Sequence, residues 1–154
     1  KITLIVVGRT VEKHYVTAIN DYLERTKHFI RLTLKLFGVK KHQDLTEDQQ
    51  KDKEGELIVK AIQPGDVIVL LDEFGKEFRS VEFANWIERK MHHVNKRLVF
   101  IIGGPYGFAP KNQIAQEKIS LSKMTFSHQM VRLIFAEQLY RAMTILNGGP
   151  YHHE

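Results

Sequence analysis

The chain has 154 residues, a length typical of one domain, and 43% of them are hydrophobic, as expected of a folded protein. Its 23 Lys and Arg exceed its 18 Asp and Glu, and the net charge of +5 suits RNA, DNA or anionic metabolites as well as an ordinary surface. The absence of Cys excludes disulfides, thiolate nucleophiles and Cys-ligated metals, and no apolar run approaches the roughly 18 residues that cross a bilayer. We therefore expect a cytoplasmic protein with no membrane span.

Predicted strands and helices alternate along the chain. In chain order we expect a strand at residues 2–7, a helix at 11–28, a strand at 29–37, a helix from the Thr46 cap to 62, a strand at 67–71, a helix at 81–92, a strand at 98–102, a helix at 111–116, a strand at 118–121 and a helix at 128–146. The almost unbroken apolar run of the first strand is typical of a parallel sheet, whereas the alternation in 29–37 indicates a half-exposed strand near an edge. The pattern predicts one α/β domain over residues 1–154, with a mostly parallel sheet and helices on both faces.

Three segments of unusual composition follow predicted strands: residues 72–75, 103–108 and 122–127. Because ligands of parallel sheets bind beyond the carboxyl ends of the strands, we expect a binding site at this edge. The chain lacks a G-x-G-x-x-G fingerprint and a Walker A motif, which argues against a nicotinamide enzyme, an NTPase and an ordinary Rossmann-type methyltransferase. No metal site is expected, since the adjacent His92 and His93 point in different directions on a helix.

The segment before the final helix has two interpretations. Ser127 is a candidate helix cap, and Met124 and Phe126 are either core residues or the walls of a ligand site. Free backbone amides and carbonyls in such a loop are able to hold an adenine ring. The Gly103-Gly104 turn is likewise either an ordinary tight turn or a place where the backbone approaches a ligand closely.

The final helix carries few polar side chains. His128 and Arg132 lie one turn apart and project from the same face. Glu137 and Arg141 form an i, i+4 pair of the kind found on helix surfaces. The helix is apolar over more than half of its circumference, which favours a self-complementary dimer interface. Residues 151–154, at the polar end of the chain, are expected to be disordered.

Short motifs in a fixed order cover essentially the whole chain. They are Gly8 after the first strand, Lys53-Glu54-Gly55, Leu71-Asp72 with Gly75-Lys76, Ile102-Gly103-Gly104 with Gly107, Leu-Ser-Lys-Met-Thr-Phe-Ser-His at 121–128, Glu-Gln-Leu-Tyr-Arg-Ala at 137–142, and Pro150-Tyr151-His152. With this order and spacing the chain resembles the small RlmH-type ribosomal RNA methyltransferases of the knotted SPOUT superfamily.

The resemblance implies a C-terminal trefoil knot within about residues 66–146, a rare exception to the rule that chain connections do not thread through one another. It also implies S-adenosylmethionine as the cofactor, bound in the knot. The cofactor-binding residues that it implies are Leu71, Gly103, Gly104, Leu121, Ser122, Lys123, Met124, Thr125 and Phe126.

The implied reaction is methyl transfer to N3 of a pseudouridine in 23S ribosomal RNA of the assembled ribosome. The implied assembly is a homodimer in which the tail of one subunit completes the site of the other. His128 is then a candidate for handling the N3 proton, and Arg132 for contacting a phosphate or the anionic ring. Tyr151 and His152 would position the nucleotide from the partner subunit. Relatives often end in Tyr-His-Arg or Tyr-His-Lys, whereas this chain has His153, which is mostly uncharged near neutral pH.

Three alternatives remain open. The chain is compatible with a non-catalytic RNA-binding module of the same fold, with a methyltransferase of this superfamily that has a different RNA target, and with an α/β enzyme for a small anionic metabolite. Binding of S-adenosylmethionine distinguishes the first from an enzyme. The salt dependence of affinity distinguishes the last, because losing several phosphate contacts makes RNA binding fall steeply with salt.

Overall fold

A computed structural model describes residues 1–8, 12–37, 46–93, 97–103 and 117–153. Its five strands are β1 (Ile2–Val7), β2 (Leu32–Phe37), β3 (Val67–Glu77), β4 (Leu98–Ile102) and β5 (Glu117–Ser120), and its helices are α1 (Lys13–Thr26), α2 (Glu47–Ala61), α3 (Ser80–His93) and α4 (His128–Leu146). The strands form one sheet in the order β2-β1-β4-β3-β5, and every pair of neighbours is parallel. The predicted α/β fold is confirmed. The predicted helix at 111–116 lies outside the described residues.

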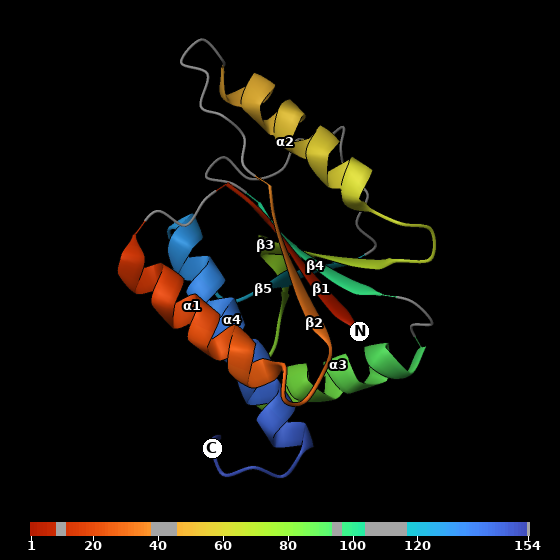
Figure 1. The fold of residues 1–154 in the computed structure, drawn as a ribbon, viewed down its shortest axis with the longest axis vertical. Coiled ribbons are helices and arrows are strands. Elements are labelled where there is room, and N and C mark those ends of the chain that lie inside the picture. The colour runs from red at the N-terminus through yellow and green to blue at the C-terminus, as the bar shows by residue number, and fades with distance from the viewer. Residues whose placement is uncertain (9–11, 38–45, 94–96, 104–116, 154) are drawn as a thin grey trace.

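The helices cover both faces of the sheet, α1, α3 and α4 on one side and α2 on the other (Figure 1). β1 shows why, because its side chains alternate between two separate apolar clusters. Leu4 and Val6 pack in the cluster shared with α1, α3 and α4, whereas Ile5 and Val7 pack with Ile58 of α2. A strand that is buried on both sides needs no polar alternation, and this accounts for the apolar run in the sequence.

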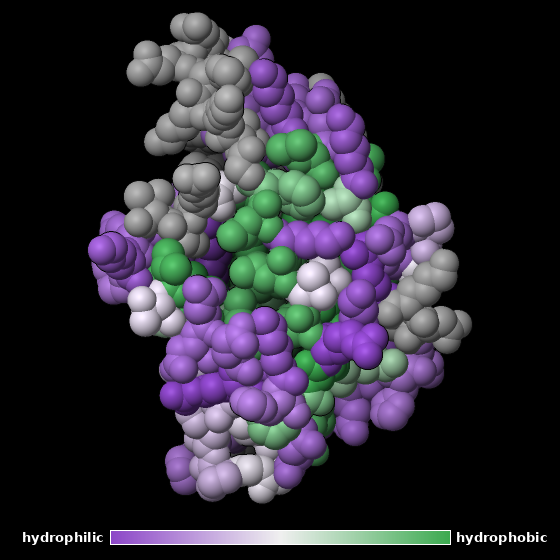
Figure 2. All heavy atoms as spheres, in the orientation of Figure 1, coloured by the Kyte–Doolittle hydropathy of each residue, from purple (hydrophilic) through white to green (hydrophobic). Residues whose placement is uncertain are grey.

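β2 is the edge strand that the alternating pattern predicts. It starts at Leu32 rather than at residue 29, because the N–H groups of Phe29 and Ile30 donate to the Thr26 carbonyl and extend the turn that ends α1. Apolar side chains reach the surface around this edge, while the outer side of α2 is hydrophilic (Figure 2). α2 begins as predicted, with a capping box between Thr46 and Gln49.

The predicted end of β3 at residue 71 is wrong. The strand continues to Glu77, and both Leu71 and Lys76 align with Ile119 of β5. The intervening residues form an irregularity in the ladder, in which the Phe74 N–H donates to the Asp72 carboxylate over 2.9 Å. The local composition of residues 72–76 indicates a turn, but pairing with β5, which is distant in sequence, makes this segment part of β3.

The amino-terminal edge of the sheet contains a buried ion pair. Arg97, just before β4, donates from Nε and Nη2 to the two carboxylate oxygens of Asp66, just before β3, over 2.9 and 2.6 Å. Arg97 Nη2 also donates to the Ala61 carbonyl, and Asp66 accepts from the Gln63 N–H. The pair joins the starts of two neighbouring strands at the edge opposite to the predicted binding site. No helix among the described residues is both long and apolar enough to span a membrane.

Candidate active site

The predicted cofactor residues meet at the carboxyl edge of the sheet. Leu71 is buried at the end of the apolar part of β3, Gly103 directly follows β4, and residues 121–126 follow β5. Because these strands are adjacent and parallel, their carboxyl ends come together. Gly104 lies outside the described residues.

Hydroxyl groups shape the segment between β5 and α4. Ser120 Oγ donates to the Ser122 carbonyl over 2.8 Å, and Ser122 Oγ accepts from the Met124 N–H over 3.0 Å. Thr125 Oγ1 donates to the Glu73 carboxylate over 2.9 Å, which ties the segment to the irregular part of β3. Ser127 caps α4 as predicted by accepting from the Met130 N–H.

Met124 and Phe126 are surface residues of this segment, so their interpretation as core residues is wrong. Met124 is 72% exposed, and Phe126 is also exposed. Both apolar side chains flank a loop whose hydroxyl groups are used for local turns. This is the arrangement expected of a loop that holds a flat, partly apolar ligand through its backbone and its flanking side chains.

Gly75 is the residue that lets β3 approach β5 closely. A Cβ at this position would lie 2.6 Å from the backbone N and C of Ile119. Only glycine fits without moving one strand, and β5 leads directly into the candidate cofactor segment.

Replacing Gly75 by Ala is therefore expected to cost about 1–3 kcal/mol of unfolding free energy and to weaken binding of S-adenosylmethionine. Urea unfolding and calorimetric titration measure the two effects. Gly149→Ala is the matched control, because its Cβ would meet Thr144 at an ordinary 3.5 Å. Wild-type stability and affinity in the Gly75 variant would contradict this account of the strand contact.

Arg132 lies inside the protein, at the end of β1. It is 2% exposed, and its Nη2 donates to the carbonyl of Val7. Gly8 follows with φ +87°, a backbone conformation that favours glycine. Burial lowers the pKa of Arg132 to about 10, although the negative charge of Glu54 acts in the opposite direction. The guanidinium stays charged at neutral pH and binds the edge of the sheet rather than facing solvent.

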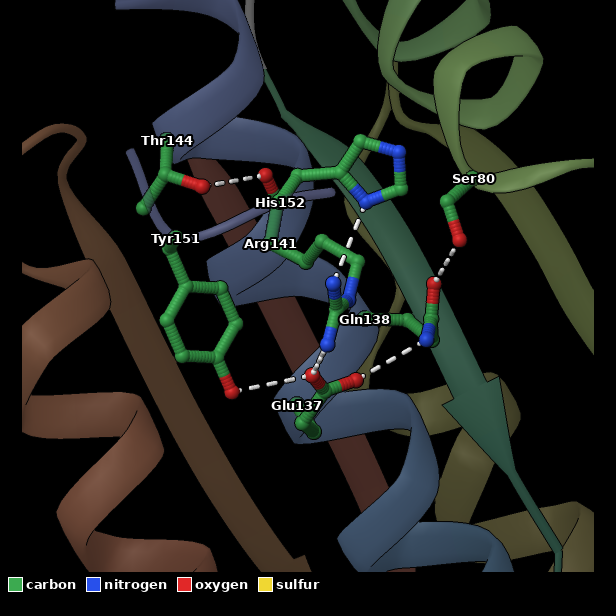
Figure 3. Close-up of polar contacts among 7 residues, drawn as sticks. All are labelled: Ser80, Glu137, Gln138, Arg141, Thr144, Tyr151 and His152. Carbon is green, nitrogen blue, oxygen red and sulfur yellow. Dashed lines mark hydrogen bonds and ion pairs between the residues drawn. The ribbon is translucent and has the colours of Figure 1, made fainter. Parts of the chain in front are cut away.

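Tyr151 and His152 fold back on α4, contrary to the disorder predicted for this end of the chain; residue 154 lies outside the described residues (Figure 3). Tyr151 packs edge-on against Tyr140, with ring centroids 4.8 Å apart, and its hydroxyl donates to Glu137 Oε1 over 3.0 Å. Arg141 pairs with the same oxygen and lies 3.1 Å from His152 Nδ1. The tail is polar in composition, but the Tyr151 ring and the carboxylate of Glu137 hold it against α4.

Glu137 and Arg141 are more than a surface pair. Glu137 Oε1 accepts from Arg141 Nε and Nη2 over 3.0 and 2.6 Å. Glu137 Oε2 accepts from the side-chain amide of Gln138. The amide oxygen of Gln138 accepts in turn from the Ser80 hydroxyl of α3. The guanidinium also lies 4.8 Å from the centre of the Tyr151 ring. Burial and hydrogen bonding to Tyr22 and Glu137 raise the pKa of Tyr151 beyond its ordinary range, so its hydroxyl stays protonated and keeps donating.

The four predicted catalytic residues form two separate groups within one chain. His128 and Arg132 lie at the start of α4, while Tyr151 and His152 dock at Glu137 and Arg141, about 13 Å further along the helix axis for nine residues of rise. A single chain therefore does not bring all four to one point.

A pocket of about 180 Å³, partly open to solvent, lies between β5 and the helices α3 and α4. It is lined by Phe78, Ser80, Phe83, Ile119, Ser120, Leu121, Ile134 and Gln138. Leu121 is the one predicted cofactor residue in that lining, so this pocket borders the candidate cofactor segment. Within the described ranges, no group of three His, Asp or Glu side chains is placed to hold a metal ion.

Two residues of the site were not found from the sequence. Glu73 holds the candidate cofactor segment through Thr125, and Glu54 is a buried acid of α2. Lys53-Glu54-Gly55 contributes to the family resemblance, but nothing in a charged helix indicates that one of its acids is buried.

Comparison with known proteins gives full-length matches. A family model described as "Predicted SPOUT methyltransferase" matches residues 1–152. The curated protein "Ribosomal RNA large subunit methyltransferase H" of Phocaeicola vulgatus is 78% identical over 156 aligned positions, which cover 100% of this chain and 99% of that protein. Proteins of the same name from Bacteroides fragilis and Porphyromonas gingivalis are 72% and 50% identical, with the same coverage.

Proposed function

We propose, from the premise that this chain belongs to the SPOUT methyltransferase family, that it transfers the methyl group of S-adenosylmethionine to ribosomal RNA of the large subunit. The family implies a trefoil knot and S-adenosylmethionine as the cofactor. The substrate class is carried by full-length relatives of up to 78% identity, named for methylation of this RNA. We further propose that the methyl acceptor is N3 of a pseudouridine in 23S RNA of the assembled ribosome. We also propose that residues 1–154 act as one domain in the cytoplasm, with the knot within about residues 66–146.

The residues at the carboxyl edge of the sheet fit the cofactor. The loop at 121–126 carries the exposed side chains of Met124 and Phe126, and Leu71 supplies a buried apolar wall. Close packing of Gly75 on β5 sets the start of this loop. When bound, the cofactor supplies an electrophilic methyl group on a sulfonium. The protein then has to align the acceptor and manage its proton.

His128 is our candidate for accepting the proton. It is the first residue of α4, separated from the candidate cofactor segment only by Ser127, and it is half-buried. The N3–H of a pseudouridine is a weak acid, so its nitrogen attacks a methyl group readily only when a base accepts the proton. A neutral imidazole at this place accepts the proton from N3, and Arg132 one turn later keeps His128 and the helix start in position.

The docked tail supports a site shared between two chains. Tyr151 and His152 dock at Glu137 and Arg141, which lie about 13 and 20 Å along α4 from His128. We propose that they act on the nucleotide bound to the partner subunit of a homodimer. His152 presents its Nδ1 to Arg141, whose guanidinium only donates, so the proton of a neutral ring is on Nε2. Nε2 is buried and has no hydrogen-bond partner among the described residues, which suits a contact made on assembly.

Glu137 holds the tail in this proposal. Replacing Glu137 by Gln removes the charge that Arg141 and Tyr151 share, and is expected to lower methyl transfer at saturating cofactor by about tenfold or more. The affinity for S-adenosylmethionine is expected to change less than about twofold. Initial rates on large ribosomal subunits and calorimetric titration measure the two quantities. Glu88→Gln, an exposed position on α3, is the control. Unchanged turnover in the Glu137 variant would remove the tail from the active site.

The function itself is tested with labelled S-adenosylmethionine and a panel of RNAs. Intact ribosomes, large subunits, free 23S RNA and transfer RNA are incubated with the protein, and the labelled nucleoside is identified by mass spectrometry. We expect label in the assembled particles, as a methylpseudouridine. Label in transfer RNA alone would indicate another RNA target, and binding of cofactor and RNA without any transfer would indicate a binding module.

A further inference from the structure

A chain of hydrogen bonds links the start of α3 to the docked tail across the side of α4 (Figure 3). Ser80 Oγ donates to Gln138 Oε1 over 2.9 Å, although the two residues lie 58 positions apart in the sequence. Gln138 Nε2 donates to Glu137 Oε2, also over 2.9 Å. Glu137 Oε1 accepts from the Tyr151 hydroxyl over 3.0 Å. Gln138 therefore joins α3 to the carboxylate on which the tail docks.

Only one orientation of the Gln138 amide suits both of its neighbours. A carboxylate only accepts hydrogen bonds, so the amide must turn its NH2 group towards Glu137 and its oxygen towards Ser80. The Ser80 hydroxyl, which is able to donate or to accept, donates to that oxygen. The opposite orientation would set the amide oxygen against the carboxylate oxygen. The amide is therefore matched in polarity to both side chains.

The two oxygens of Glu137 serve different partners. Oε1 accepts from Arg141 and from Tyr151, whereas Oε2 accepts from Gln138. Hydrogen bonds to a charged group are stronger than those between neutral groups, and Glu137 is only partly accessible to water that would replace them. Turning the carboxylate would break the bond to Gln138 and would move Oε1 away from the Tyr151 hydroxyl. The amide therefore fixes the orientation in which Glu137 receives the tail.

The other end of this chain of hydrogen bonds lies beside the candidate cofactor segment. Ser80 and Gln138 line the pocket between β5, α3 and α4, and Leu121 of that segment lines the same pocket. α3 and α4 pack on the same face of the sheet (Figure 1). Because Ser80 is the first residue of α3, its bond anchors the side chain of Gln138 to a second element of the core. The tail is thus held in place relative to the framework that carries the cofactor segment.

We propose that Gln138 is a positioning residue for methyl transfer: held by the Ser80 hydroxyl, its amide fixes the Glu137 carboxylate and thereby the docked position of the tail. This rests on the proposed function, in which the tail acts on the bound nucleotide. It also gives a role to the Gln of the Glu-Gln-Leu-Tyr-Arg-Ala motif at 137–142.

The test compares two substitutions of Gln138 with wild type on large ribosomal subunits. Gln138→Met keeps the approximate size and removes both hydrogen bonds, so we expect kcat to fall by about fivefold or more while KM for S-adenosylmethionine changes less than about twofold. Gln138→Glu should be slower still, because it sets a second carboxylate against Glu137. Gln63→Glu, at an exposed position before β3, is the matched control and should behave as wild type.

Ser80→Ala tests the bond to α3. We expect a smaller loss of kcat than in Gln138→Met, because the amide keeps its bond to Glu137 but loses its anchor. Since Ser80 acts through Gln138, the double variant should be no slower than Gln138→Met alone.

The docking of the tail is measured without catalysis, as the rate at which a carboxypeptidase removes the last residues, followed by mass spectrometry. This rate should rise by about threefold or more in Gln138→Met and should stay at the wild-type value in Gln63→Glu. Urea unfolding shows whether each variant is fully folded in the assay.

A kcat loss in fully folded Gln138→Met, together with faster digestion of the tail, supports the proposal. The proposal is overturned if kcat or the digestion rate stays at the wild-type value, if kcat falls only in proportion to the folded fraction, or if the effects of Ser80→Ala and Gln138→Met on kcat add. Its failure is distinct from failure of the proposed function, which would appear as wild-type protein that transfers no methyl group to ribosomes in the same assay.

Discussion

Replacing His128 by Ala is expected to lower methyl transfer to the large ribosomal subunit by about 10²–10⁴-fold, the usual contribution of a positioned acid or base. The reason lies in the acceptor, whose N3–H must lose its proton as the bond to the methyl group forms. His128 lies two residues after the end of the candidate cofactor segment and is half-buried at the start of α4. Binding of S-adenosylmethionine should change less than about twofold, because in this account His128 acts on the acceptor and not on the cofactor.

Single-turnover rates with labelled cofactor, measured across pH, check this expectation. The rate of His128→Ala should stay far below the wild-type rate near neutral pH, where N3 keeps its proton unless a base accepts it. His93→Ala, an exposed histidine at the end of α3, is the matched control and should keep the wild-type profile. A His128 variant with near-wild-type turnover would assign the proton to another group.

The second large effect concerns stability. Replacing Asp66 by Asn is expected to lower the free energy of unfolding by about 3–5 kcal/mol, because it leaves the guanidinium of Arg97 buried beside a neutral amide. Both side chains are almost fully buried at the amino-terminal edge of the sheet. Urea unfolding measures the loss. Asp21→Asn, which removes an exposed pair with Arg25, is the control and should cost less than about 1 kcal/mol.

The same pair predicts a pH dependence. Burial alone would raise the pKa of Asp66, but the hydrogen bonds from Arg97 and from the Gln63 N–H outweigh it and hold the pKa below the ordinary 3.8. The stability from this carboxylate is therefore present above pH 3.8 and is lost as the pH falls through the lowered pKa. The difference in unfolding free energy between wild type and Asp66→Asn should shrink below that pH. A difference that stays constant down to pH 2 would contradict this assignment.

Elements with a strong local pattern were predictable from the sequence. The apolar run of β1 indicated a central parallel strand, the alternation in β2 an edge strand, and Ser127 the start of α4. The second part of β3 was not predictable, because residues 72–76 are polar and become strand by pairing with β5, which lies more than forty positions later. The docked tail was missed for a similar reason, since Tyr151 is held by side chains of α4 rather than by its neighbours in sequence.

The candidate site was predictable in composition but not in arrangement. Motifs and the order of strands placed Leu71, Gly103 and the segment 121–126 at one edge of the sheet, as the structure has them. The burial of Arg132 was not predictable, because its carbonyl partner belongs to β1 and its opposite charge to α2. Spacing along one helix gives the side on which a residue projects, whereas burial depends on segments from distant parts of the chain.

Mixing two inactive chains tests most directly whether one subunit supplies the cofactor segment and His128 while the other supplies the tail. His128→Ala and Tyr151→Phe chains carrying different affinity tags are co-expressed, and the heterodimer is purified and assayed on large ribosomal subunits. If the site is shared, one site of each heterodimer combines the intact His128 of one chain with the intact tail of the other. The second site carries both substitutions. About half of the wild-type activity per dimer should therefore return. A heterodimer as inactive as its parents would contradict the account, as would a protein that transfers methyl groups as a monomer.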